Sequence, residues 1–366
     1  MAVGQGPSGI IHNVAGIRLS AVKAGIRYED RLDLVLIQLC EESKSSGVFT
    51  QNAFCAAPVV IAKSHLSSHN PRILIINTGN ANAGTGDIGL QDALECCQAV
   101  AECNELEIQQ VIPFSTGVIG EKLPVDKIVA GVPVALDRLD EMNWQDAAKG
   151  ILTTDTRPKL ISRQIKVADN FVNITGFAKG SGMIRPNMAT MLSFVFTDAH
   201  IEKETLDKMI GELVDESFNR ITVDGDTSTN DAAMLIATGK SGVSIAELDD
   251  SNRKRFDACL KSVFQELAKE VIKDAEGATK FISVVVKEGI DKEECVKVAY
   301  CVAESPLVKT ALFASDANWG RILAAIGRAG LDNLDTRSVN IDIGDVRIVT
   351  KGNIEETYTE EKVHLL

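Results

Sequence analysis

The feature that most limits how this 366-residue chain can fold is its alternation of short apolar runs with amphipathic helical segments. Runs such as 32–39 (LDLVLIQL) and 72–77 (RILIIN) have the length and the branched side chains of buried strands. Residues 202–218 and 252–273 instead carry apolar side chains three and four positions apart, which predicts helices with one buried face. This alternation predicts a mixed α and β fold, of the α+β kind, in which sheets are layered between helices.

Other segments follow the same patterns over shorter lengths. The further runs with strand character are 10–19 (interrupted at Gly16), 58–62, 111–114, 164–175, 191–196 and 280–286. The further helical segments are 90–103, 293–303 and 319–329. Residues 339–349 predict a hairpin that turns at Gly344 and Asp345, and residues 43–47 predict an exposed turn.

Composition and charge limit the partners of the chain. With 45% hydrophobic residues it can bury a large core, either as two subdomains or as one layered domain. A formal net charge of −13 would repel nucleic acid and anionic membranes, so neither is expected as a standing partner. No apolar stretch is long enough to span a bilayer, and the start of the chain lacks the pattern of a targeting segment. We therefore predict a cytoplasmic protein.

Cysteine and acidic residues give no sign of a metal site. The eight cysteines form no C-x-x-C pair and have no histidine at metal-ligand spacing, which favours free, buried thiols. The acidic loop VDGDTSTND contains Asp224, Asp226 and Asp231, but it lacks the glycine and glutamate of a calcium-binding loop. The sequence thus predicts no metal and no bound cofactor.

The stretch 179–196 (KGSGMIRPNMATMLSFVF) carries the strongest chemical signal. A glycine-rich loop passes into an apolar strand at Thr190, and none of the five histidines lies near this position in sequence. If the bond between Ala189 and Thr190 breaks, Thr190 gains an α-amine whose pKa of about 7.7–8.0 suits a general base. A threonine activated by its own amine is a known nucleophile. Alternatively, Thr190 is an ordinary β-branched strand residue.

Two glycine-containing turns also have chemical potential. The strand 111–114 leads into Thr116 and Gly117, and a tight turn with a glycine can present backbone N–H groups as an oxyanion hole. Gly84, Gly86 and Gly89 match G-x-G-x-x-G, which is typical of dinucleotide sites. However, the first of these glycines comes well after the strand end, and no acidic residue follows where a ribose would need it. A plain turn is the preferred interpretation of that glycine pattern.

Seven separated motifs occur together in a fixed order. They are NTGNANAGTG (77–86), STGVIG (115–120), TTDTRPK (153–159), KGSGMIRPNMATML (179–192), FNRITVDGDTSTND (218–231), EGATKF (276–281) and SDANWGRI (315–322). This set closely resembles the ornithine acetyltransferase family, also called glutamate N-acetyltransferases or bifunctional arginine biosynthesis proteins. The resemblance covers nearly the whole chain, so it is more specific than any one motif.

The resemblance implies a self-cleaving enzyme. Cleavage at the Ala189–Thr190 bond would give an α chain, 1–189, and a β chain, 190–366, that begins with the nucleophile Thr190. The two chains would form an αββα-type sandwich and assemble as α2β2. Thr190 would carry an acetyl group from N-acetylornithine to glutamate in a ping-pong cycle. Acetyl-CoA is a further possible substrate.

The same resemblance assigns other site residues. Thr116 and Gly117 would form the oxyanion hole. Thr153 and Glu276 would contact the substrate, with Thr154 and Thr156 as neighbours of Thr153 that could take its role. Lys179 lies eleven positions before Thr190, and its charge could bind the substrate carboxylate or lower the pKa of the Thr190 amine. In the family a final segment adds an asparagine and a threonine to the pocket. This sequence ends at YTEEKVHLL without them, so either the sequence is truncated or the pocket is completed differently.

Two rival functions follow from the residues. An aminopeptidase or amidase would use the same threonine and resolve the acyl-enzyme with water instead of glutamate, although the motifs from Thr153 to Glu276 favour transfer. A non-catalytic dinucleotide-binding protein would instead use residues 84–89 and would leave the chain uncleaved.

Overall fold

The computed structural model describes residues 2–167, 169–185 and 191–359. The chain packs as two compact units, residues 1–278 and 279–366, and each is described by itself. This division is one of packing and does not correspond to the predicted cut between Ala189 and Thr190. Both of those residues lie outside the described part of the chain.

The first sheet of the 1–278 unit has the strand order β1-β2-β4-β5. Its strands are β1 (Ile17–Val22), β2 (Leu34–Leu39), β4 (Ile73–Asn80) and β5 (Val111–Val118). β1 and β2 pair antiparallel, as do β2 and β4, whereas β4 and β5 run parallel with helix α2 (Gly86–Glu102) between them in the chain. All four strands are almost entirely buried because both faces of the sheet are covered.

The second sheet has the order β3-β9-β8-β7-β6. Its strands are β3 (Lys44–Phe49), β9 (Ala232–Ala237), β8 (Leu192–Thr197), β7 (Asn170–Lys179) and β6 (Lys159–Val167). β8 and β9 are parallel, and the other neighbours are antiparallel. The register places Lys179 opposite Leu192 and Leu192 beside Ala232. The end of β7 therefore meets the starts of β8 and β9 at one edge.

The two sheets pack face to face through alternating side chains. Phe177, Phe194 and Phe196 of the second sheet lie in one fully buried cluster with residues of β1, β2, β4 and β5. Phe194 meets Phe114 edge to face at 5.0 Å, and Trp144 meets Phe196 in the same way at 5.4 Å. Such aromatic pairs add stability beyond the burial of their apolar area.

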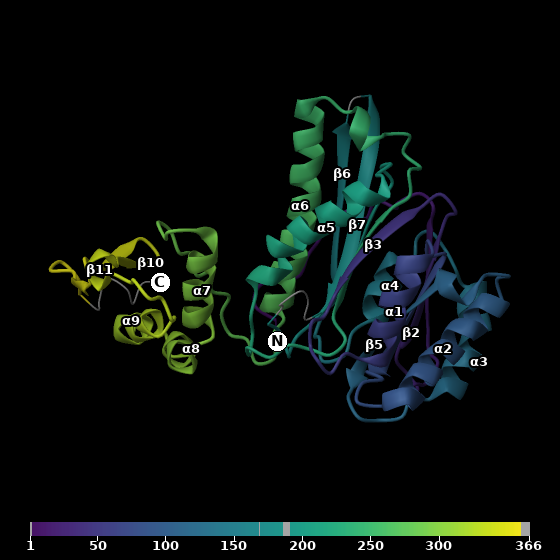
Figure 1. The fold of residues 1–366 in the computed structure, drawn as a ribbon, viewed down its shortest axis with the longest axis horizontal. Coiled ribbons are helices and arrows are strands. Elements are labelled where there is room, and N and C mark those ends of the chain that lie inside the picture. The colour runs from purple at the N-terminus through teal and green to yellow at the C-terminus, as the bar shows by residue number, and fades with distance from the viewer. Residues whose placement is uncertain (1, 168, 186–190, 360–366) are drawn as a thin grey trace. The chain divides into compact units, whose positions relative to one another are not determined.

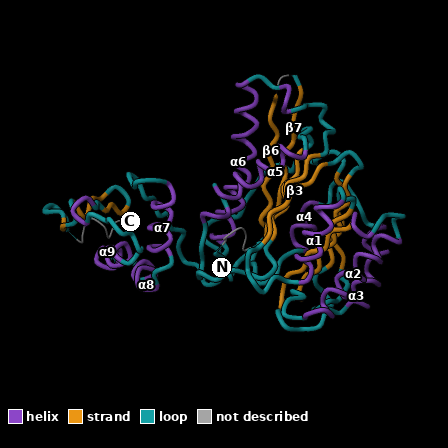
Figure 2. The backbone as a smooth tube through the Cα atoms, viewed as in Figure 1, coloured by secondary structure: helices purple, strands orange, loops and turns teal. Residues whose placement is uncertain are grey.

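Helices cover both outer faces. α2 and α3 (Val125–Asp137) share a buried cluster with the outward side chains of the first sheet. α5 (Lys203–Asp215) and α6 (Asp250–Lys273) do the same for the second sheet. Asp249 caps α6 by accepting a hydrogen bond of 2.8 Å from the N–H of Asn252. The predicted αββα sandwich is thus confirmed, and Figures 1 and 2 show the strands between the two helical layers.

The remaining helical segments of this unit lie beside the sheets. They are α1 (Ala57–Ser68), α4 (Trp144–Gly150) and the short 3₁₀ turns Ile108–Gln110, Phe218–Arg220 and Ile245–Glu247. α1 and α4 add Val59 and Trp144 to the core between the sheets. Among the described residues, no helix has both the length and the apolar character needed to cross a membrane.

The 279–366 unit has its own small core. Its elements are α7 (Lys292–Ala303), α8 (Pro306–Phe313), α9 (Trp319–Gly327), a 3₁₀ turn (Thr336–Ser338), β10 (Ile341–Ile343), β11 (Val346–Thr350) and β12 (Asn353–Ile354). Ile341, Ile348 and Val349 are buried against α9, and Asn318 caps that helix by accepting from the N–H of Arg321. The predicted hairpin around Gly344 is confirmed.

Several local predictions are wrong. Residues 58–62 lie in α1, because Pro58 opens a helix there and a short apolar run does not distinguish helix from strand. Residues 43–47 are not an exposed turn, since most of them belong to β3 and pair with β9, a strand that the sequence did not reveal. The predicted strand 164–175 is part of the β6–β7 hairpin. Residues 280–286 form neither strand nor helix.

The core between the sheets gives a direct test of this architecture. Phe177→Ala should destabilise the protein by about 3–5 kcal/mol, because it leaves a cavity between two packed sheets. Phe171→Ala on the same strand is the matched control, since Phe171 is 59% exposed, and it should change stability by less than about 0.5 kcal/mol. Urea unfolding measures both variants. Equal effects would contradict the face-to-face packing.

Candidate active site

One cavity in the 1–278 unit brings together the predicted substrate and oxyanion residues. Thr116, Gly117, Thr153, Lys179 and Glu276 all line this central cavity, whose volume is about 490 Å³. The other lining residues are Arg27, Tyr28, Arg31, Asp33, Thr78, Gly79, Ala81, Val118, Ile119, Thr154, Gly182, Met183, Met191, Leu192, Asp224, Ser228, Thr229, Asn230 and Asp231. Residues from separate parts of the sequence thus converge on one space large enough for an amino-acid substrate.

The predicted cleavage site and nucleophile are the one part of the predicted site whose position is not described. Ala189 and Thr190 lie outside the described residues. Met191, which follows Thr190, lines the central cavity, and its carbonyl accepts a hydrogen bond of 2.9 Å from the N–H of Ala232 at the start of β9.

Thr116 and Gly117 lie within the last residues of β5. The prediction from the sequence, a turn that follows a strand ending at residue 114, is therefore wrong at these two positions. The register between β4 and β5 shifts here, at Gly79 and Asn80. Gly117 has φ +140°, and a Cβ on it would lie 2.2 Å from the carbonyl carbon of Gly79. Only glycine allows the two strands to approach so closely.

Lys179 ends β7 and lines the central cavity. Its ammonium group donates a hydrogen bond of 3.2 Å to the hydroxyl oxygen of Thr116, which connects the two sheets. Burial lowers the pKa of Lys179, and the carboxylate of Asp155 offsets part of this effect. The side chain can therefore lose its proton more easily than an exposed lysine.

Asp155 interacts electrostatically with Lys179 and belongs to a buried ionic network that the sequence did not predict. It accepts hydrogen bonds from Lys159 at 2.6 Å and from the N–H of Gly180 at 2.8 Å. Lys159 also donates to Asp274 at 2.6 Å, and the side chains of Lys159, Asp155 and Asp274 have no exposed surface. Burial raises the pKa of Asp155, but the charges of Lys179 and Lys159 outweigh it and bring the pKa to about 2.

The three candidate threonines separate in the structure. Thr153 and Thr154 line the cavity, and the N–H of Thr153 donates to Asp155 at 3.0 Å. Thr156 instead turns toward Asp274, to which both its N–H and its hydroxyl group donate. Arg31 donates to the carbonyl of Thr153 at 2.8 Å and so helps to hold this loop.

Glu276 reaches the cavity from the turn after α6. Its N–H donates to the carbonyl of Ser181 at 2.9 Å, and its carboxylate packs against Gly182, where an added Cβ would lie 2.9 Å from Oε1. Glu276 is an exposed residue, so its carboxylate is available to an ammonium group of a bound ligand.

Asp231 is a second acidic group at the cavity. The sequence analysis considered its loop as a calcium site and rejected that role, because the loop lacks the required glycine and glutamate. Asp231 is only 3% exposed, and its Oδ2 has no hydrogen-bond partner among the described residues. Burial raises its pKa well above the usual range of a carboxyl group, although Ser228 and Lys179 oppose the shift.

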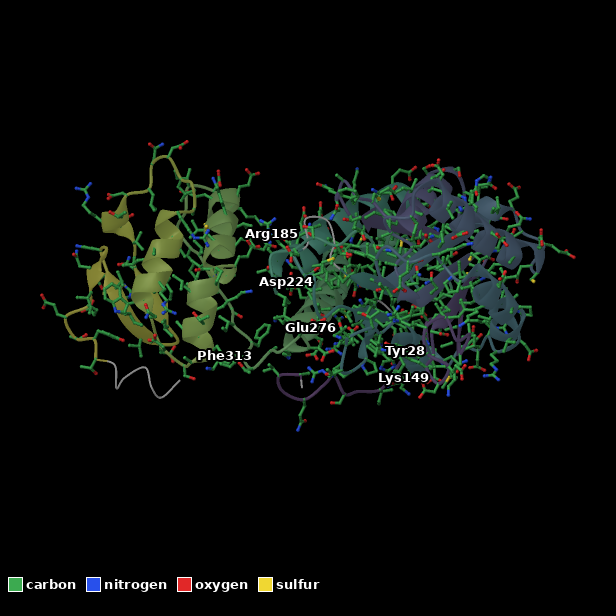
Figure 3. All side chains as sticks on the ribbon, turned by 90° about the horizontal axis from the view of Figure 1, so that it is seen from below. Tyr28, Lys149, Arg185, Asp224, Glu276 and Phe313 are labelled. Carbon is green, nitrogen blue, oxygen red and sulfur yellow. The ribbon has the colours of Figure 1, made fainter. Side chains whose placement is uncertain are left out.

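Four cavity residues come from the loop between β1 and β2. They are Arg27, Tyr28, Arg31 and Asp33, and Arg27 forms an ion pair of 2.8 Å with Glu121. The sequence analysis identified none of the four, since no local pattern marks a loop that folds over a distant site. Figure 3 labels Tyr28, Asp224 and Glu276, which come from three separate loops around the cavity.

Comparison with known proteins identifies the family. The model of the ArgJ family matches residues 18–366. The chain belongs to the ArgJ family. It is 52% identical to the arginine biosynthesis bifunctional protein ArgJ of Psychrobacter arcticus over 353 residues, which cover 96% of this chain and 86% of that protein. The ArgJ protein of Pseudomonas syringae pv. tomato is 49% identical over 365 residues, covering 99% of this chain and 89% of the relative.

A solved structure is also similar to this chain. It is the ornithine acetyltransferase of Mycobacterium tuberculosis complexed with ornithine, which is 33% identical. The match covers 49% of this chain and 93% of that chain, with a TM-score of 0.42. Family membership favours the acetyltransferase interpretation of the sequence over the aminopeptidase and dinucleotide-binding alternatives.

The close approach of β4 and β5 predicts a sharp difference between two glycines. Gly117→Ala should cost about 1–3 kcal/mol from overpacking against β4, in addition to about 1 kcal/mol of backbone strain. Gly120→Ala, at φ +83° with open space around its Cβ, should show only the strain. Chemical denaturation measures the two variants, and the same cost for both would refute the tight approach at Gly117.

The buried carboxyl of Asp231 predicts a pH-dependent gain in stability. The pKa of Asp231 is higher in the folded state than its unfolded value of about 3.9, so its burial destabilises the protein as pH rises above that value. Asp231→Asn should therefore raise the melting temperature at pH 7, and the gain should shrink toward pH 4. Asp226→Asn, at an exposed position in the same loop, is the control and should have little effect at either pH. If the melting temperature of Asp231→Asn instead rose relative to the wild-type protein as the pH fell, Asp231 would be ionised in the folded protein.

Proposed function

We propose that this chain transfers an acetyl group from N-acetylornithine to glutamate in arginine biosynthesis, through an acetyl ester on Thr190. The observation that carries the proposal is the convergence of Thr116, Gly117, Lys179 and Glu276 on one cavity, in a chain that belongs to the ArgJ family. The relatives named above are bifunctional arginine biosynthesis proteins, and the similar solved structure is complexed with ornithine.

The first stage is self-cleavage. The hydroxyl oxygen of Thr190 attacks the carbonyl carbon of Ala189, and the peptide nitrogen takes up the hydroxyl proton and leaves as the α-amine of Thr190. Water then hydrolyses the resulting ester, which frees the Ala189 carboxylate and restores the hydroxyl group. The products are an α chain, 1–189, and a β chain, 190–366, whose first residue carries its own base.

The second stage is acetyl transfer. The α-amine of Thr190 takes the proton of its hydroxyl group as the oxygen attacks the acetyl carbonyl of N-acetylornithine. Thr116 and Gly117 stabilise the negative charge that develops on the carbonyl oxygen. The amide bond breaks, the proton passes to the leaving nitrogen, and ornithine departs. The amine of glutamate then attacks the acetyl ester, a proton passes from that amine to the oxygen of Thr190, and N-acetylglutamate departs.

The remaining cavity residues hold the amino-acid part of the substrates. Lys179 attracts a carboxylate and Glu276 accepts hydrogen bonds from an ammonium group, roles supported by the presence of both residues at the cavity. Thr153 supplies a further polar contact. With acetyl-CoA as donor, the same ester would form on loss of the thiol, so no bound cofactor is needed. We further propose an α2β2 assembly that acts in the cytoplasm.

Electrophoresis and a two-substrate assay test both stages. Denaturing gels should show two fragments for the wild-type protein and one intact chain for Thr190→Ala, which should also lose transfer, because the nucleophile and its base are both absent. Release of ornithine from N-acetylornithine should depend on added glutamate. Equal release without glutamate would indicate a hydrolase, and an intact but fully active wild-type chain would end the proposal.

A further inference from the structure

Lys159 occupies an unusual position for a lysine. It begins β6, its side chain is fully buried, and it is not among the residues that line the central cavity. Its ammonium group nevertheless lies 2.6 Å from a carboxylate oxygen of Asp155 and 2.6 Å from one of Asp274. A charge is costly to bury, so an arrangement of this kind points to a role beyond the burial of apolar area.

Asp155 uses both of its oxygens to hold residues of the site. Oδ1 accepts from Lys159 and from the N–H of Gly180, the residue directly after Lys179. Oδ2 accepts from the N–H of Thr153. One carboxylate therefore fixes two segments that carry predicted substrate residues.

Asp274 holds a third segment of the site, the turn that carries Glu276. Its Oδ2 accepts from Lys159 and from the N–H of Thr156, and its backbone carbonyl accepts from the hydroxyl group of Ser181 at 2.8 Å. The carbonyl of Ser181 in turn accepts from the N–H of Glu276. The turn that presents Glu276 is thus tied to the loop after Lys179.

We propose that Lys159 is a positioning residue of the acetyl-transfer site. It holds Asp155 and Asp274 together, and these carboxylates fix the segments that present Thr153, Lys179 and Glu276 to the substrate. The inference rests on the proposed function for the identity of the substrate. Precise placement of binding groups matters because a displacement of about 1 Å can cost about a hundredfold in rate.

Lys159 also acts on Lys179 through charge. The titratable groups that face Lys179 are Asp155, Asp231 and Glu276, whose ionised forms raise its pKa, and Lys159, whose charge lowers it. Burial is the largest influence and lowers the pKa. Loss of the Lys159 charge should therefore raise the pKa of Lys179 and keep it protonated to higher pH.

Two variants separate positioning from stability. Lys159→Met leaves two buried carboxylates without their shared cation and should destabilise the fold strongly. The triple variant Asp155→Asn/Lys159→Met/Asp274→Asn removes all three charges and should restore much of the stability. However, an asparagine has one acceptor oxygen where Asp155 uses two, so the triple variant loses a bond to either Thr153 or Gly180.

The control is a destabilising substitution outside this network. Val263→Ala opens a cavity in the fully buried face of α6, and Val263 does not line the central cavity. It should lower the melting temperature but leave the KM for N-acetylornithine unchanged.

The measurements are melting temperature, steady-state kinetics per cleaved chain, and the affinity for N-acetylornithine by calorimetry. For the triple variant we expect near-wild-type stability, at least about a tenfold weaker affinity and about a hundredfold lower kcat/KM. Lys179 attracts a carboxylate only while it is protonated, so its deprotonation should weaken substrate binding at high pH. In Lys159→Met this weakening should begin at a higher pH than in the wild-type protein.

A triple variant with wild-type affinity and KM would overturn the positioning role. The same conclusion would follow if affinity and kcat/KM fell only in proportion to the fall in melting temperature, as calibrated with Val263→Ala. If the wild-type protein binds N-acetylornithine but transfers no acetyl group, the proposed function fails while the affinities still decide the role of Lys159. If the wild-type protein does not bind N-acetylornithine at all, both proposals fall.

Discussion

The register of the second sheet is the constraint on which the rest of the structure depends. β7 runs antiparallel to β8, and β8 runs parallel to β9, so the end of β7 and the starts of β8 and β9 lie at one edge. That edge brings together Lys179, Met191 and Asp231, although 52 positions separate the first from the last. A slip of one residue would turn each of these side chains to the opposite face.

The stacking of the two sheets supplies the other half of the site. β5 of the first sheet ends at the same cavity, and the hydrogen bond from Lys179 to Thr116 joins the sheets at their rim. The aromatic cluster of Phe177, Phe194 and Phe196 holds the sheets at a fixed separation behind the cavity. Chemistry at the rim therefore depends on packing in the interior, because interiors of this density deform little.

Much of the fold could be predicted from the sequence, since amphipathic periodicity reports local structure directly. The helices over 202–218 and 252–273 and the hairpin at Gly344 follow from spacing alone. The predicted turn at 43–47 and the predicted strand at 58–62 were wrong. Such short runs lack a clear period, and tertiary contacts decide their conformation.

Some residues of the candidate site could likewise be predicted from the sequence, and others could not. Thr116, Lys179 and Glu276 lie in continuous motifs, so a sequence comparison finds them. The contact between Lys159 and Asp274 spans 115 positions, and no local pattern reveals it. The attraction between these buried charges must offset the cost of removing them from water, and only the folded chain defines that balance. Arg27 and Tyr28 were missed for the same reason.

The strand order has a consequence for a protein cut between residues 189 and 190. β8 and β9 would belong to the newly formed second polypeptide, yet they lie between β7 and β3 of the first, with ladder pairing on both sides. The two polypeptides would be interleaved within one sheet, like complementing fragments. Dissociation would require breaking two strand interfaces at once, so the severed backbone bond would leave the halves inseparable while the sandwich stays folded.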